Sequence, residues 1–252
     1  IYTMFLEIDI PQIYTQYTAD STWSGSATDF NTTDAKGTIS WVNNTGHASV
    51  LYYDIKIGGQ LIDRQYSEWM EIWTQLTQSE SKKRGLDQLL NRNSNLEKTS
   101  AAQTLYVPLQ FWFCRNIGLA LPLIALQYHE VRFNIEFNSA TDLLVSSGYA
   151  SLTGVNNLSF QEAGLMVDYI YLDSEERRRM VQVGHEYLIE QVQFSNALSV
   201  SGTSTQHELR FNHPVKELVW TVHDNSAAVD HDGDVNTAAK ASDSDITVNT
   251  AL

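Results

Sequence analysis

Histidine is the residue type in this chain best suited to metal binding or acid–base catalysis, yet its pattern supports neither. Seven histidines occur, and three of them are followed directly by glutamate: His129, His185 and His207. A zinc-protease motif would require a second histidine one helical turn later, and none of the three pairs has it. We therefore expect structural histidines, with no catalytic, cofactor-binding or metal-binding residue.

Other signatures of chemistry are equally weak. The sequence has no Gly-x-Ser-x-Gly elbow and no phosphate-binding glycine loop. Carboxylates such as Asp54, Asp168 and Glu190 would suit glycoside hydrolysis only if two of them came together, and nothing in the sequence brings them together. Residues 230–234, Asp-His-Asp-Gly-Asp, look like the start of a calcium loop, but the glycine is displaced and the closing glutamate is absent. We expect an exposed loop there.

N-glycosylation sites are the only functional sites that the sequence predicts. Asn31, Asn43 and Asn157 each begin an Asn-x-Ser/Thr sequon in an expected loop, which predicts glycan attachment on an exterior surface. The single cysteine, Cys114, lies among aromatic residues and excludes an internal disulfide. Cysteine usage of this kind suits a reducing compartment, and a buried, inert thiol is the simplest interpretation.

Composition indicates a folded, acidic protein. The chain has 252 residues, of which 42% are hydrophobic and 11% aromatic, enough for a sizeable core. It carries 30 acidic and 16 basic residues, a net charge of −14. Because nucleic-acid binding depends on lysine and arginine replacing condensed counterions, we expect no direct contact with nucleic acid. No apolar run approaches the roughly 20 residues that a membrane helix needs.

Hydrophobic periodicity favours strands through most of the chain, separated by polar connections rich in Ser, Thr, Asn, Asp and Gly. Residues 131–137 alternate strictly, with Val131, Phe133 and Ile135 on one face and charged or amide side chains on the other. Many strands without long intervening helices indicate an all-β sandwich or barrel. The expected strands are 4–10, 37–42, 49–57, 105–113, 131–137, 165–172, 187–194, 208–212 and 217–223.

Two segments have helical patterns instead. Within residues 64–76, aromatic and apolar side chains recur at helical spacing and predict a face packed on a sheet. Residues 174–181 predict a short helix, with Asp173 as N-cap and Glu176 at the third helical position. Residues 78–100 are mostly polar and predict a surface excursion with a short helix near 85–90.

Residues 107–137 carry a family resemblance. The words PLQFWFCRN, GLALPLIALQYHEV and RFNIEF in this segment resemble the signature of the major capsid proteins of large nucleocytoplasmic DNA viruses. Further stretches resemble that family in the same order, namely MFLEIDIP, IGGQLIDRQYSEWMEIW, VDYIYLDSEERRRMVQVGHEYLIEQVQ and FNHPVKELVW. Together they cover most of the chain.

The resemblance implies a double jelly roll, two side-by-side antiparallel β-sandwiches with a few short helices. By that mapping, residues 1–172 form most of the first jelly roll without its opening strand or strands, 173–183 form a linker helix, and 184–252 form only the start of the second. It further implies a homotrimer that gives a pseudo-hexagonal capsomer of an icosahedral double-stranded DNA virus shell. The implied partners are neighbouring capsomers, minor capsid proteins and a nearby internal viral membrane, in a virion assembled in the host cytoplasm.

Two other functions compete with this structural role. A jelly-roll carbohydrate-binding module or glycosidase domain would use exposed aromatic residues, with Trp23 the first candidate to stack on a sugar ring. A cupin-type metal enzyme would need clustered histidines, which the sequence lacks. We expect no enzymatic activity and no cofactor.

Overall fold

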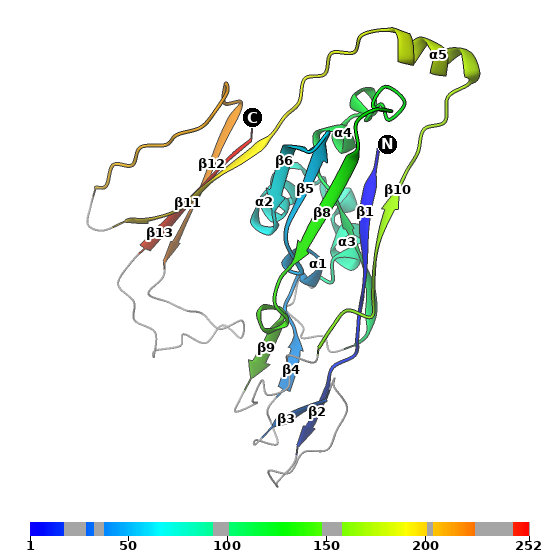
Figure 1. The fold of residues 1–252 in the computed structure, drawn as a ribbon. Helices are drawn as coiled ribbons and strands as arrows, with labels where there is room; N and C mark the ends of the chain where they lie inside the picture. Colours follow the sequence, from blue (N-terminus) through cyan, green and yellow to red (C-terminus); the bar gives the residue numbers. More distant parts are fainter. Residues whose placement is uncertain are drawn as a thin grey trace. The chain divides into compact units, whose positions relative to one another are not determined.

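The computed structural model describes residues 1–17, 29–32, 38–92, 101–147, 158–200, 204–224 and 244–251 (Figure 1). The chain divides into two compact units. The first contains Ile1–Leu61 and Gln65–Tyr187, and the second contains Ile62–Arg64 and Leu188–Leu252.

One sheet of the first unit has β1 (Met4–Ile10) at its centre. Strands β10 (Glu162–Val167) and β7 (Gln103–Pro108) pair with β1 on its two sides, both antiparallel. Alternate side chains of β1 are buried, as the period-2 geometry of a strand requires when one face covers a core. These buried residues are Met4, Leu6, Ile8 and Ile10.

A second sheet of the first unit has the strand order β6 (Gln60–Tyr66), β5 (Val50–Ile57) and β8 (Val131–Phe137). Gly58 and Gly59 form the turn between β5 and β6 with positive φ angles of 59° and 83°, which glycine adopts without steric cost. The predicted alternation of β8 is confirmed in its solvent-facing positions, because Arg132 and Glu136 are exposed whereas the residues between them are half-buried.

Aromatic rings pack the segment that follows β7 against the second sheet. Phe111, just after β7, lies with its ring centroid 5.0 Å from Tyr53 of β5 and 5.9 Å from Phe133 of β8. Phe113 stacks on Phe111 at 5.3 Å. Tyr53, Phe111 and Phe113 are fully buried. We call Tyr53, Phe111, Phe113 and Phe133 the aromatic cluster. Such rings combine large apolar area with favourable edge-to-face and stacked contacts, so the cluster is the centre of this unit's core.

The buried hydroxyl of Tyr53 is fully satisfied. It donates to Gln65 Oε1 at 2.6 Å and accepts from the Gln110 backbone N–H at 3.1 Å. Gln65 Nε2 in turn donates to the Gln110 carbonyl at 3.0 Å. Because a buried polar group costs free energy unless it is hydrogen-bonded, this closed ring of bonds lets a phenol lie inside an apolar core and ties β5, β6 and the segment after β7 together.

Two smaller strand pairs complete the described sheets of the first unit. Strand β4 (Thr38–Trp41) pairs with β9 (Leu144–Ser147) in antiparallel fashion, next to the 3-10 helix η2 (Ala140–Leu143). Strands β2 (Tyr14–Tyr17) and β3 (Asp29–Thr32) run parallel to one another.

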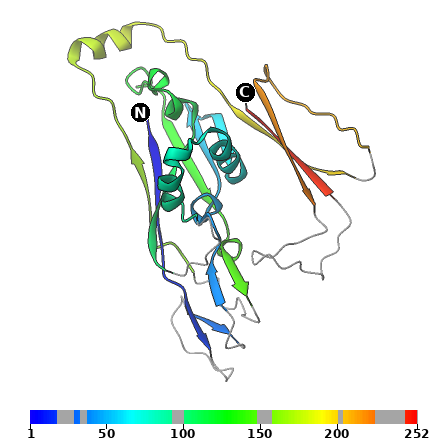
Figure 2. The ribbon, with the colours of Figure 1, turned by 180° about the vertical axis from the view of Figure 1, so that it is seen from behind.

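Short helices accompany the sheets. They are α1 (Thr45–Ala48), α2 (Ser67–Thr77), α3 (Glu80–Leu89), α4 (Trp112–Arg115), η1 (Ile117–Leu119) and α5 (Ser174–Gln182). Helices α2 and α3 lie on one side of β5 and β8, the side that faces the viewer in Figure 2. The predicted cap of α5 is confirmed, because Asp173 accepts a hydrogen bond from the Glu176 backbone N–H at 2.8 Å. Within the described residues, no helix is both long and apolar enough to cross a bilayer.

The described part of the second unit is built around one antiparallel sheet. Strand β13 (Ser244–Ala251) is central, between β11 (Val192–Val200) and β12 (Glu217–Asp224).

Several strand predictions were wrong in extent. The strand expected over residues 105–113 ends at Pro108, and the apolar run continues as α4. The strand expected over residues 165–172 is β10, which begins and ends earlier, at Glu162–Val167. The strand expected over residues 187–194 is β11, which begins and ends later, at Val192–Val200. Residues 208–212 form no strand. The helix expected from residue 64 begins only at Ser67, because β6 continues to Tyr66.

A pair of glycine substitutions tests the packing of α1. A Cβ added at Gly46 would lie 2.8 Å from Leu90 Cδ2 and 3.1 Å from Leu90 Cα, whereas one added at Gly85 in α3 meets nothing within 4 Å. Because Leu90 is fully buried, we expect Gly46→Ala to lower the free energy of unfolding by about 1–3 kcal/mol. Gly85→Ala should raise it by about 0.5–1 kcal/mol. Urea unfolding measures both, and a Gly46→Ala variant as stable as the parent would contradict the tight contact.

Candidate functional site

The histidines expected to be structural do not gather into a metal site. Among the described residues, no group of three or more His, Cys, Asp or Glu side chains could hold a metal ion. His129, His185 and His213 are exposed, and His207 is half-buried. His231 and the calcium-like loop over 230–234 lie outside the described residues.

His47 is the buried histidine, and it belongs to a polar cluster that the sequence did not reveal. Its side chain is 2% exposed in α1, and its Nδ1 lies 3.0 Å from Oε2 of Glu71 in α2. The same oxygen accepts from Asn44 Nδ2 at 2.7 Å. Arg92, just after α3, forms an ion pair with the other oxygen of Glu71. We call His47, Asn44, Glu71 and Arg92 the His47 cluster.

The electrostatics of this cluster keep His47 neutral. Burial, and secondarily the Arg92 guanidinium, lower the pKa of His47 from 6.5 to about 4. At neutral pH its contact with Glu71 is therefore a hydrogen bond, with Nδ1–H donating to the carboxylate, and not an ion pair. The permanent positive charge in the cluster is Arg92, which also lies 3.7 Å from Asp87. The arrangement fixes three helical segments to one another.

Backbone bonds reinforce the same junction. Asn44 N–H donates to Asn91 O, and Gly46 N–H donates to Leu90 O, both at 3.0 Å. Asn91 Nδ2 donates to the buried Thr45 hydroxyl at 2.9 Å. Thr45 is also the hydroxyl residue of the sequon at Asn43, and it is fully buried.

The three predicted glycosylation sites lie in different settings. Asn43 is half-buried, and its side-chain oxygen accepts from the Asn44 backbone N–H at 3.0 Å. Asn31 lies in β3, and Asn157 lies outside the described residues. Glycan attachment at Asn31, Asn43 and Asn157 stays a prediction.

Cys114 lies in α4 as a free, half-buried thiol. Burial raises its pKa to about 12. Since the thiolate is the nucleophilic form, this thiol is unreactive at neutral pH, as its aromatic neighbours in the sequence suggested.

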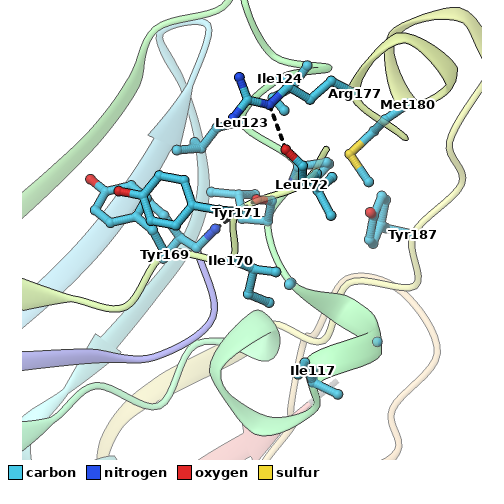
Figure 3. Close-up of a pocket in the computed structure, with 15 residues that line it drawn as sticks. Ile117, Leu123, Ile124, Tyr169, Ile170, Tyr171, Leu172, Arg177, Met180 and Tyr187 are labelled. Carbon is cyan, nitrogen blue, oxygen red and sulfur yellow. Dashed lines mark hydrogen bonds between the residues drawn. The ribbon is translucent and has the colours of Figure 1, made fainter. Parts of the chain in front are cut away.

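The first unit contains an apolar groove (Figure 3). Its volume is about 620 Å³. One wall consists of residues 117–124, the other of residues 169–172, and α5 contributes Arg177 and Met180. Arg177 Nε donates to the Leu172 carbonyl at 2.9 Å. The lining contains no nucleophile with an adjacent base, so the groove suits binding and not covalent chemistry.

The His47 cluster predicts how the free energy of unfolding depends on pH. The unfolded state binds a proton at His47 below pH 6.5, whereas the folded state binds it only near pH 4, so stability falls as the pH falls between these values. The shift corresponds to at most about 3 kcal/mol. We expect His47→Gln to flatten the dependence of unfolding free energy on pH between pH 6.5 and pH 5. Most carboxylates titrate at lower pH, so their protonation contributes little to the slope in this window.

The matched control is His129→Gln, at an exposed position. It should keep the slope of the parent protein. An unchanged slope in His47→Gln would show that His47 is not buried in its neutral form.

Comparisons with known proteins give the family. A family model described as "Major capsid protein N-terminus" matches residues 1–173, and one described as "Large eukaryotic DNA virus major capsid protein" matches residues 176–251. The major capsid protein of Pyramimonas orientalis virus is 47% identical over 180 residues, which cover 69% of this chain and 42% of that protein. Capsid protein 1 of Acanthamoeba polyphaga mimivirus is 40% identical over 231 residues, covering 86% of this chain and 37% of that protein.

A solved structure agrees with these relatives. A chain of the "PBCV-1 virus capsid, quasi-atomic model" superimposes with a TM-score of 0.65 at 27% identity, covering 87% of this chain and 48% of that one. This match confirms the all-β double jelly-roll class expected from the sequence. The chain spans less than half the length of these relatives. By its sequence matches and its fold, the chain belongs to the major capsid protein family of large eukaryotic DNA viruses.

Proposed function

We propose that this chain is a structural part of a viral shell, with most of a first jelly roll in residues 1–172, a linker helix over 173–183 and the start of a second jelly roll in 184–252. The observation that carries this proposal is the succession of two capsid family models along one chain, over 1–173 and then 176–251. Their junction falls next to the capped start of α5.

The physical properties of the chain suit a building block and not an enzyme. The described residues hold no metal-binding cluster. The buried side chains of Tyr53 and His47 form hydrogen bonds that join different elements. A net charge of −14 opposes contact with phosphate backbones, so the protein encloses nucleic acid without binding it directly.

The proposed assembly is a homotrimer that forms a pseudo-hexagonal capsomer of an icosahedral shell. Around a threefold axis, one patch of each subunit meets a different patch of the next. Neighbouring capsomers and minor capsid proteins are the further partners, an internal viral membrane lies nearby, and assembly takes place in the host cytoplasm. The fold match to a chain of a virus capsid supports this arrangement.

A carbohydrate-binding role has less support. Sugar rings stack on exposed aromatic faces, and Trp41 and Trp112 are buried with 3% exposure each, whereas Trp220 of β12 is 62% exposed. Trp23, the first candidate for stacking, lies outside the described residues. Asp54 does not support the glycosidase alternative either, because its carboxylate is buried on β5. Its Oδ1 accepts a hydrogen bond from Asn134 Nδ2 at 2.6 Å.

Light scattering coupled to size-exclusion chromatography tests the proposal directly. We expect the purified chain to elute with the mass of three copies and to show no glycoside hydrolysis and no binding to a glycan array. The trimer should persist at raised salt if apolar contacts hold it together, since surface charge pairs weaken under screening. A monomer that binds glycans would contradict the proposal and favour the carbohydrate-binding function.

A further inference from the structure

A second groove of the first unit is lined by helices α2 and α3 and by the paired strands β1 and β7. We call it the α2–α3 groove. Its volume is about 510 Å³, within the range of roughly 300–1,000 Å³ that is typical of ligand sites. Each of the four elements contributes an apolar side chain, among them Phe5, Trp73, Leu86 and Pro108. The groove therefore offers an apolar surface to a bound molecule.

Several polar side chains that line the α2–α3 groove have hydrogen-bonding groups without a partner. Thr74 is 6% exposed, yet within the described residues its hydroxyl forms no hydrogen bond. The hydroxyl of Thr77, by contrast, donates to the Trp73 carbonyl at 2.7 Å. The side-chain amides of Gln78 and Gln110 also have no partner in the described part of the chain. Because polar groups away from water are normally hydrogen-bonded, these side chains indicate that a bound molecule completes the site.

Gly85 keeps one wall of the α2–α3 groove open. It lies inside α3 and lines the groove, and a Cβ added there would meet nothing within 4 Å. Glycine weakens a helix interior relative to alanine, and no close packing contact requires it at this position. A larger side chain would occupy the groove, so glycine preserves the space for a bound molecule.

Unpaired cations of α3 lie at the same groove. Lys82 lines the groove and is exposed, and Lys83 and Arg84 follow it in the helix. Within the described residues, none of these three side chains forms an ion pair, whereas Arg92 pairs with Glu71. An ammonium group beside apolar walls attracts a carboxylate that is attached to an apolar body. The local charge therefore favours an acidic ligand.

The amide side chains in the groove distinguish between kinds of acidic ligand. A carboxamide both donates and accepts hydrogen bonds, so Gln78 and Gln110 match the N–H and C=O groups of a peptide backbone. The acyl chain of a fatty acid would leave both amides unpaired, at a cost in free energy. The groove thus suits a peptide better than a lipid.

We propose that the α2–α3 groove binds an extended acidic segment of another polypeptide, with apolar side chains against Trp73 and Leu86 and a carboxylate against Lys82. Alternate side chains of an extended segment point to opposite sides, so one set enters the groove while the backbone bonds with Gln78 and Gln110. Apolar pockets for alternate side chains are how other sites recognise extended peptides. The site rests on the proposed function as a shell subunit and adds to it a contact with a second kind of polypeptide.

Fluorescence anisotropy with peptide mixtures tests this site in the whole chain. One mixture of fluorescein-labelled hexapeptides alternates Leu, Ile or Phe with Asp or Glu, and the matched mixture has Asn or Gln in place of the acids. We expect the acidic mixture to bind about tenfold more tightly, because only a carboxylate forms a charge-assisted bond with Lys82. Equal affinities, or no binding of the acidic mixture, would overturn the proposal.

Substitutions at Gly85 connect the binding to the groove. Gly85→Leu places a side chain in the groove, and leucine favours a helix more than glycine does, so the variant should fold. We expect it to weaken binding of the acidic mixture by about tenfold. Gly85→Ala adds only a methyl group and should keep the affinity within about twofold. A Gly85→Leu variant that binds as tightly as the parent would show that the peptides bind elsewhere and would refute the site.

Removal of single charges from α3 tests the role of Lys82. Lys82→Gln should weaken binding of the acidic mixture about fivefold. Arg84→Gln removes the same charge from the same helix, but Arg84 does not line the groove, and its effect should stay within about twofold. Equal losses in the two variants would contradict a carboxylate bound at Lys82.

Light scattering on the same variants separates this site from the proposed assembly. We expect Gly85→Leu to form a trimer as the parent does. Loss of the trimer in Gly85→Leu would show that a second copy occupies the groove, which refutes a separate partner and leaves the shell function in place. A parent that stays monomeric and still binds the acidic mixture in a Gly85-dependent way would support the site and refute the proposed function.

Discussion

The contact between the segment that follows β7 and the second sheet of the first unit is the constraint on which the rest of that unit depends. Three-stranded sheets with one apolar face are not stable alone, because each must bury that face against another layer. Here the aromatic cluster provides the contact, with Phe111 packed between Tyr53 and Phe133 at 5.0 and 5.9 Å. The hydrogen bonds from Tyr53 to Gln65 and Gln110 then fix the rings in one position.

The His47 cluster and the apolar groove follow from that core in different ways. Around His47, polar groups are buried because they satisfy one another, so the cluster holds α1, α2 and the end of α3 in place. Along residues 169–171, large apolar side chains are exposed. A rigid frame of this kind lowers the conformational entropy that is lost when subunits associate.

The sequence predicted the elements with strict periodicity and failed where one pattern fits two structures. Met4–Ile10 and Val131–Phe137 were predicted correctly because their alternation has no helical counterpart. The run over 105–113 was assigned to one strand, although its second part is α4, because a continuous apolar run is compatible with a strand or a buried helix. The N-cap of α5 was found because Asp173 and Glu176 form a local signal.

The two sites could not have been found in this way. His47 and Glu71 lie 24 positions apart and in different helices, so no local spacing connects them. The groove joins residues 117–124 to residues 169–187 only after β1, β7 and β10 have paired. The family resemblance supplied the fold class, but only the structure shows that the exposed residues 169–171 lie beside residues 120–124.

A double-mutant cycle between Phe111 and Phe133 tests most directly whether the aromatic cluster joins the segment after β7 to the second sheet. Urea unfolding of Phe111→Leu, Phe133→Leu and the double variant gives the coupling free energy between the two rings. The structure predicts a coupling of about 0.5–1.5 kcal/mol, as for other aromatic pairs in contact. Losses that add to within about 0.3 kcal/mol would show that the rings do not interact, and would contradict a core built on this contact.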